Sequence, residues 1–171
     1  GLIANIGVDF ELKSDGSQRI PDYRVIAKVM EGQVTEPLSP VPLYNLEGEL
    51  LIENDRVVVH NVSAANGESE LYLDGEVQRQ DGETIKRFNI HAANLWLDRQ
   101  MRALLPPKQQ ELFDLINPSG RFTIRAGYDS HADRPLRLEQ WTALDCTMEH
   151  QKFPYPLTGI TGTIGQHDDR L

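Results

Sequence analysis

The sequence predicts a mainly β fold: a curved antiparallel sheet, or a partly open β-sandwich or groove, with a short helical segment near residues 98–117. Most of the chain alternates apolar and polar residues with a period of two, which is typical of half-buried strands. Turn-forming pairs such as Asp81-Gly82 separate the alternating runs. Helical spacing is confined to one segment, so the rest of the chain is expected to be sheet.

The alternating runs place a set of apolar side chains on one face of the predicted sheet. Runs are expected near residues 4–12, 23–29, 46–53, 56–62, 70–79, 88–92, 120–128 and 138–148, with a glycine-rich strand at 159–165. The candidate apolar face, either a groove or a core, consists of Ala4, Ile6, Val8, Phe10, Leu71, Leu73, Val77, Phe88, Ile90, Phe122, Ile124, Tyr128, Leu144 and Met148.

Two segments depart from the alternation. Residues 31–42 contain three prolines and are expected to form a loop or an edge segment, because proline cannot donate to a strand ladder. Between residues 98 and 117 the apolar residues take helical spacing, and Pro107 can begin a second short helix at its first position. These helices are expected to seal one end of the sheet.

Composition excludes several classes of function. The 171 residues suit one medium domain, and a net charge of −9 disfavours binding to nucleic acid or to an anionic membrane surface. No apolar stretch approaches the length needed to cross a bilayer. The single cysteine, Cys146, precludes an internal disulfide and is interpreted as a small buried apolar residue.

The chain contains an internal repeat. Residues 42–57 align without a gap on residues 156–171 at an offset of 114, with identities that include Pro42/Pro156, Gly48/Gly162 and Arg56/Arg170. At an offset of 118 the apolar residues of 4–10 fall on those of 122–128, and Tyr23 falls on Trp141. Residues 1–57 and 120–171 are therefore predicted to be two copies of one half-repeat, with residues 58–119 as the other half, present once.

A repeat of this kind has consequences for the whole protein. About one and a half units are present, and a sheet built of such units needs neighbours to cover its edges. We therefore expect a fragment of a longer protein that continues on both sides, with flanking repeats as partners and any membrane anchor outside these residues.

The residues from Pro42 to Val77 resemble a known family. A Pro-Leu turn is followed by Gly48-Glu49-Leu50, by Asp55–Ala64 and by Gly67–Val77, and the first part recurs at residues 153–171. This pattern, about a third of the chain, is similar to the repeats of AsmA-like and TamB-like bacterial envelope proteins. The helical segment and the proline-rich loop are not part of a minimal repeat of that family.

The resemblance implies a structure, a location and a ligand. It implies a long antiparallel sheet rolled into an apolar groove, on the periplasmic side of a bacterial cell envelope. It further implies that phospholipid, or another acyl-chain ligand, is carried along the groove. Membership would make the chain a non-catalytic segment for lipid transport or envelope maintenance.

No motif for catalysis, metal binding or a cofactor is recognisable, and none is expected. The five histidines lack metal-ligand spacing, and the glycine-rich 159–165 segment is not followed by a helix that would cradle a phosphate. Two other functions stay open: a structural or interaction β-sandwich module of a large surface or envelope protein, and a carbohydrate-binding or hydrolytic β-sandwich. The last would need a cleft joining Trp96 or Trp141 to carboxylates.

Overall fold

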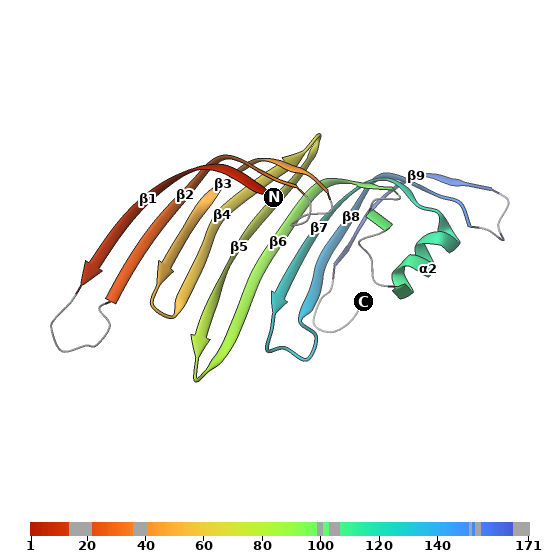
Figure 1. Cartoon of the computed structure of the whole chain (residues 1–171). Helices are drawn as coiled ribbons and strands as arrows, with labels where there is room; N and C mark the ends of the chain where they lie inside the picture. The colour runs from red at the N-terminus through yellow and green to blue at the C-terminus, as the bar shows by residue number, and fades with distance from the viewer. Residues whose placement is uncertain are drawn as a thin grey trace. The chain divides into compact units, whose positions relative to one another are not determined.

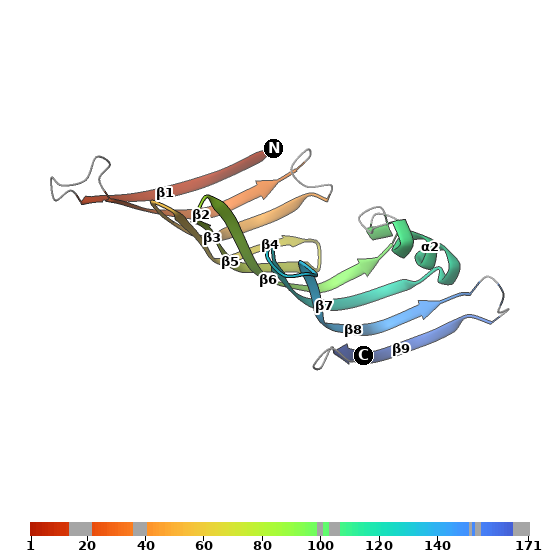
Figure 2. The same cartoon turned by 90° about the horizontal axis from the view of Figure 1, so that it is seen from below.

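The protein forms one nine-stranded antiparallel sheet in which the strands follow each other in chain order, β1 to β9 (Figures 1 and 2). The computed structural model describes residues 1–13, 22–35, 41–98, 101–102, 107–150, 152 and 155–165. The strands are β1 (Leu2–Lys13), β2 (Asp22–Val34), β3 (Leu43–Glu53), β4 (Arg56–Asn66), β5 (Ser69–Gln80), β6 (Glu83–Leu97), β7 (Ser119–Asp129), β8 (Leu136–Met148) and β9 (Leu157–Gly165), and helix α2 spans Pro107–Ile116.

The sheet is a single layer. All nine strands belong to the same sheet, and among the described residues no second sheet packs against it. Few side chains are consequently buried, and no described side chain is less than 2 % exposed. The buried apolar residues are Ala64, Ala92, Phe113, Phe122, Ala126, Ala143 and Cys146. An open sheet was one of the forms predicted, and a closed two-layer core is not formed by the described residues.

The chain divides into two compact units. The first comprises residues 1–67, 71–91 and 126–137, and the second comprises residues 68–70, 92–125 and 138–171. Strands β5 to β8 contribute residues to both units.

In the first unit, three neighbouring strands each contain one residue other than glycine with a left-handed backbone. Glu31 in β2, Asn45 in β3 and Asn61 in β4 have φ values of 53°, 52° and 49°, and the strand register shifts beside each of them. These are β-bulges, in which an extra residue bends the strand and increases its twist. Asparagine suits the position because it tolerates the left-handed conformation better than most residues.

Each bulge also changes which residues face which side. In β4, Val57 and Val59 lie on one face before Asn61, and Val62 and Ala64 return to that face after it. The apolar side chains on this face are therefore odd-numbered before the bulge and even-numbered after it. A strict period of two would have turned the second half of the strand over.

A bulge in the second unit corrects one expectation about β8. The sequence pattern places Leu144 and Met148 on the same face, but Asp145 has a φ of 66° and the register with β9 shifts between Leu144 and Cys146. Leu144 therefore lies opposite Thr161, on the other face from Met148. An alternating run cannot reveal such a shift when apolar residues occur on both sides of the bulge.

The hairpins β2–β3 and β8–β9 have the same register at a single offset of 114. Ala27 lies opposite Leu50 as Trp141 lies opposite Ile164, and Val29 lies opposite Gly48 as Ala143 lies opposite Gly162. The bulges also correspond, since Glu31 and Asn45 are matched by Asp145 and by Gly159, whose φ is 66°. In these strands Trp141 therefore corresponds to Ala27, and not to Tyr23 as the offset of 118 suggested.

The helical segment begins and ends as the sequence predicts where it is described. The Asp98 carboxylate accepts a hydrogen bond from the Met101 N–H at 2.9 Å, as an N-cap residue does. Arg102 donates two hydrogen bonds to Asp114 of α2, at 2.6 and 2.5 Å. Asn117, with a φ of 38°, ends α2, and Ile116 accepts a backbone bond from Glu149 beyond β8. Figures 1 and 2 show α2 beside these ends of β7 and β8.

The strands and the helix confirm the predicted fold class. Strand β2 continues through Glu31 to Val34, into the segment expected to be a loop. Of the segment expected to be helical near residues 98–117, residues 99–100 and 103–106 lie outside the described residues. Among the helices that are described, none has the length and apolar character needed to span a bilayer.

Gly48 and Gly162 give a matched test of the packing between β3 and β4. A Cβ at Gly48 would lie 2.6 Å from Val62 Cγ2 and 2.8 Å from Val62 Cα, so Gly48→Ala should destabilise the fold by roughly 1–3 kcal/mol. At Gly162 no described atom lies within 4 Å, so Gly162→Ala should stay within about 1 kcal/mol of wild type, on the stabilising side. Urea unfolding measures both, and equal losses would contradict the assigned contacts.

The pair Arg102 and Asp114 predicts an acid-sensitive helix. The hydrogen bonds from the Arg102 guanidinium, aided by its charge and opposed by desolvation, lower the pKa of Asp114. A lowered folded-state pKa means that the contribution to stability is present above the unfolded-state pKa near 4 and is lost as the pH falls through the folded value. The protection factors of the α2 amides, which are corrected for the intrinsic pH dependence of exchange, should therefore fall in acid.

The variant Asp114→Asn supplies the control for this prediction. The α2 amides of the variant should have lower protection factors than those of wild type at pH 7 and equal protection factors at low pH. The reason is that the protonated carboxyl of wild type and the amide of the variant both lack the negative charge. An equally large acid response in the variant would mean that another group controls the helix.

Candidate functional site

One face of the sheet in the first unit is apolar across β1 to β4. The printed register sets residues side by side in rows that cross these strands. Each row on this face contains only apolar side chains or glycine. The rows are Phe10–Val25–Ile52–Val57, Val8–Ala27–Leu50–Val59, Ile6–Val29–Gly48 and Leu2–Val34–Leu43. We call this surface the apolar face.

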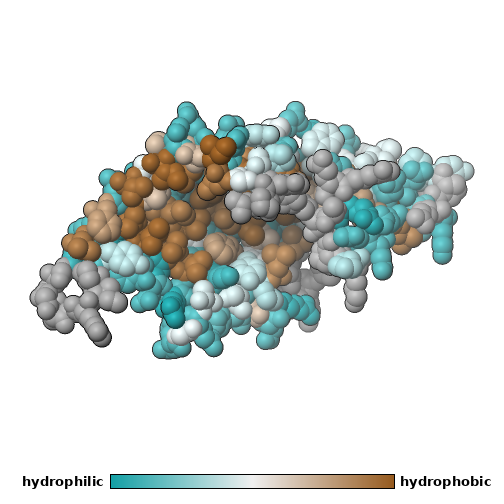
Figure 3. Space-filling view, in the orientation of Figure 1, coloured by the Kyte–Doolittle hydropathy of each residue, from teal (hydrophilic) through white to brown (hydrophobic). Residues whose placement is uncertain are grey.

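The apolar face is open where β1 forms the edge. Ile6, Val8, Phe10 and Leu12 are exposed to 54 %, 60 %, 65 % and 55 %, although they point to the same side of one strand. Figure 3 shows apolar side chains gathered over the part of the sheet that contains β1 to β4. Scattered exposed apolar residues are ordinary in soluble proteins, but a contiguous set marks a surface that something else covers.

The opposite face of the same strands carries a row of alternating charge. Arg24 pairs with Glu53, Arg56 with Glu76, and Arg87 with both Glu76 and Asp129. The residues that form this charged row, in strand order, are Glu11, Arg24, Glu53, Arg56, Glu76, Arg87 and Asp129. The row crosses β1 to β7 within the first unit and fixes the face that meets water.

Sequence reasoning missed the charged row, although a signal for it exists. Oppositely charged residues are paired in register on consecutive strands, as Arg24, Glu53 and Arg56 are beside the turn at residues 54–55. Opposite-charge neighbours across strands favour the correct pairing, and like charges would oppose it. The signal can be found only after the register is known, because the spacing between the charges depends on each loop.

The charged row identifies the apolar side of β5, β6 and β7. Asp74 and Glu76 face the charged side, since they pair with His60 and Arg56, so Leu73 and Val77 face the apolar side. Arg87 and Asp129 likewise direct Phe88 and Tyr128 to that side, where their rings lie 6.4 Å apart. The predicted residues of the first unit that share this side are Ala4, Ile6, Val8, Phe10, Leu71, Leu73, Val77, Phe88, Ile90 and Tyr128.

In the second unit the corresponding side is more covered. Phe122 is 6 % exposed and meets Trp141 edge-on, with 6.3 Å between the ring centres. Ile124 shares the side of β7 that carries Phe122, and Met148 shares the side of β8 that carries Trp141. Phe113 of α2 is also buried. Of the predicted set, Leu144 alone is placed on the opposite face by the register.

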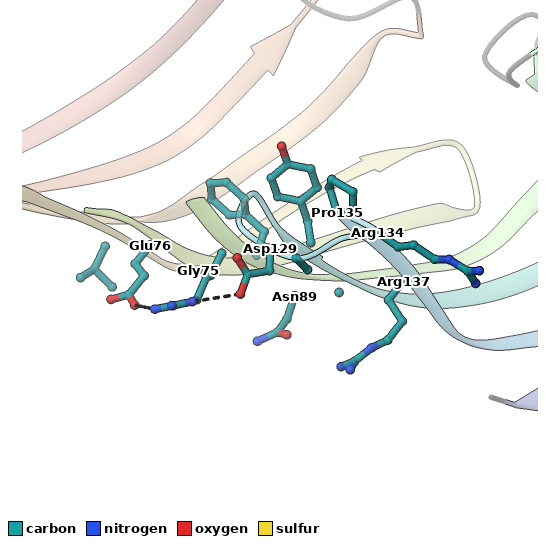
Figure 4. Close-up of a pocket in the computed structure, with 13 residues that line it drawn as sticks. Gly75, Glu76, Asn89, Asp129, Arg134, Pro135 and Arg137 are labelled. Carbon is teal, nitrogen blue, oxygen red and sulfur yellow. Dashed lines mark hydrogen bonds and ion pairs between the residues drawn. The ribbon is translucent and has the colours of Figure 1, made fainter. Parts of the chain in front are cut away.

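A pocket in the first unit contains Glu76, Arg87 and Asp129 of the charged row, together with Phe88 and Tyr128. This pocket, of about 550 Å³, is lined by residues that include Arg87, Arg134 and Arg137 (Figure 4). The Asp129 carboxylate there accepts a backbone hydrogen bond from the His131 N–H, and this bond is the main cause of the lowered pKa of Asp129. Desolvation opposes it, and the hydrogen bond and charge of Arg87 lower the pKa further. The pocket's two carboxylates, of Glu76 and Asp129, are both ion-paired with Arg87.

The residues considered for sugar binding are occupied by other contacts. The Arg121 guanidinium lies 5.8 Å from the Trp96 ring centre, and Trp141 packs on Phe122. His60 and His131 each contact one carboxylate, Asp74 and Glu83. Among the described residues no group of three metal-ligating side chains gathers, and Cys146 is a buried thiol bonded to the Arg121 carbonyl.

Comparison with protein-family models, with curated proteins and with solved structures finds no significant match in any of the three.

Removing Arg87, the arginine beside Asp129 in the charged row, should raise the pKa of Asp129. In Arg87→Ala the ion pair is lost, but the stronger influence, the hydrogen bond from the His131 N–H, remains. The pKa should therefore rise and still stay below the ordinary aspartate value. Carboxyl NMR titration measures this, and Arg134→Ala, in the same pocket, is the control that should leave Asp129 unchanged.

Proposed function

We propose that the apolar face binds the acyl chains of phospholipid or of a similar lipid, and that the chain is a non-catalytic segment of a large bacterial envelope protein of AsmA or TamB type. The observation that carries this proposal is the row of side chains on β1 that are more than half exposed on an otherwise apolar surface. The resemblance of residues 42–77 to the repeats of those proteins supports the location on the periplasmic side of the envelope.

The chemistry of the face favours a hydrocarbon ligand. Its central rows consist of valine, leucine, isoleucine, alanine and phenylalanine, and β1 to β4 already use their backbone groups to pair with one another. A ligand on this face therefore gains from displaced water and has few polar groups to satisfy. Protein interfaces are typically anchored by tryptophan, tyrosine and arginine, which are absent from the rows crossing Val8 and Ile6.

The two-sided construction also supports the proposal. The charged row holds one face in water, so the sheet presents its apolar face in a defined direction. Each buried CH₂ group of a ligand is worth about 0.8 kcal/mol, and a chain lying across several strands would bury many of them. Phe10, Val8 and Ile6 are available for such contacts without any movement of the backbone.

The alternative is an interaction module whose apolar face is covered by a second protein surface. The exposed β1 residues suit that role as well, because a second copy could close the face into a two-layer sandwich. The two hypotheses differ in what occupies the face in solution: a lipid leaves the chain monomeric, whereas a second copy makes a dimer with β1 at its interface.

Val8→Lys and Asn5→Lys provide a matched pair of variants for the test. Both add one positive charge to β1, but Val8 is on the apolar face and Asn5 is on the other, where its side chain meets Glu31. Because Val8 is 60 % exposed, its replacement should change the stability of the chain by no more than about 0.5 kcal/mol. Binding of a pyrene-labelled phospholipid should weaken about tenfold or more in Val8→Lys and stay near wild type in Asn5→Lys.

Photo-crosslinking identifies the occupant directly. Benzoylphenylalanine at position 8 should capture phospholipid from mixed vesicles or from the native envelope, and the same group at position 5 should not. The interaction hypothesis would be favoured instead if the chain forms a saturable dimer that Val8→Lys abolishes and no lipid adduct forms at position 8. Equal lipid binding by both lysine variants would contradict the proposal that lipid binds to the apolar face.

A further inference from the structure

Strand β9 ends the sheet, and its inner neighbour is β8. The shared register makes β9 the counterpart of β3, and β8 the counterpart of β2. In the first copy β3 has a second neighbour: β4 pairs with it from Tyr44 to Glu53. Among the described residues nothing occupies the corresponding edge of β9.

Two glycines distinguish the occupied edge from the open one. Gly48, in β3, has a φ of 152°, and Val62 of β4 fills the space where its side chain would be, with Val62 Cγ2 2.6 Å from the Cβ position. Gly162 corresponds to Gly48, since both lie opposite the matched residues Val29 and Ala143. At Gly162 the same space is free of described atoms to 4 Å.

A glycine in the interior of a strand usually has a structural explanation. Glycine weakens strands and has no side chain to pack, and it usually marks a bulge or a close approach by another backbone. Gly48 has such a reason in Val62, but no described neighbour supplies one at Gly162. The glycine at position 162 is explained if a strand equivalent to β4 lies beside it.

We infer that the outer edge of β9 binds one further antiparallel strand of β4 type, whose counterpart of Val62 sits over Gly162. The strand comes from a segment outside residues 1–165 that carries the same repeat. Its position follows from the β3–β4 register at the offset of 114: the counterpart of Val59 would lie opposite Ile164, that of His60 opposite Thr163, and that of Ser63 opposite Thr161.

The added strand would also cover exposed apolar surface. Ile164 is 56 % exposed and Leu157 is 51 % exposed at this edge, whereas their counterparts Leu50 and Leu43 in β3 are partly covered. A partner with alternating valines, as β4 has at 57 and 59, places apolar side chains beside Ile164 on one face. Backbone hydrogen bonds would supply affinity, and the glycine would supply register.

The test uses a peptide of residues 54–66 of this chain, which contains the sequence of β4, and the chain as it stands. The labelled peptide should bind with saturable anisotropy and should slow amide exchange in β9. Gly162→Val fills the space over the glycine, so it should weaken peptide binding about tenfold or more, while the chain alone unfolds at the same or a slightly higher urea concentration.

Thr161→Val is the matched control, because it adds a β-branched apolar residue to β9 on the opposite face from Gly162. It should change the peptide affinity by less than about twofold, and a scrambled peptide should not bind. Binding that is equal in Gly162→Val, protection confined to the β1 edge, or the absence of saturable binding at about 1 mM peptide would overturn the inference. These outcomes are separable from the lipid experiments, because Gly162 and Val8 lie on different edge strands.

Discussion

The structure depends on keeping one apolar side in a sheet that bends at almost every strand. A bulge adds one residue to a strand, so a strict alternation would place the following apolar side chains on the opposite face. In each bulged strand the apolar positions shift by one residue at the bulge, which keeps them on the same face. In β2 the apolar residues change from odd to even numbers across Glu31, and in β4 they change across Asn61. The face remains continuous because the hydrophobic pattern slips by one residue at the position where the backbone does.

Much of this fold follows from the sequence. The period of two locates eight of the strands, and the glycine-rich segment 159–165 is the ninth. Turn pairs such as Asp81-Gly82, with φ values of 52° and 83°, separate neighbouring strands. The apolar side is also predictable wherever a run is uninterrupted, as in β1 from Ala4 to Phe10. In these segments the local alternation and the strand pairing favour the same arrangement, so the sequence alone predicts which side chains share the apolar side.

The remainder requires the pairing itself. Leu144 is assigned to the wrong side because apolar residues flank Asp145 on both faces, and nothing in the alternation marks the extra residue. The charged row is invisible for a related reason: Arg24 and Glu53 are far apart in sequence, and only the register makes them neighbours. The offset of 118 fails in β8 because it matches residue types, whereas Glu31 and Asp145 match in backbone conformation.

In the part of the chain that the structure describes, the single layer leaves the apolar face and the outer edge of β9 uncovered, and these two surfaces have different chemistry. The face offers side chains such as Val8 and Phe10, which gain from any apolar cover and impose little geometry on it. The edge of β9 offers backbone groups at fixed intervals, which accept only another strand, and Gly162 restricts where that strand can lie. The proposed ligand lies against side chains of β1 to β4 and the proposed strand pairs with the backbone of β9, so the two do not compete for the same residues.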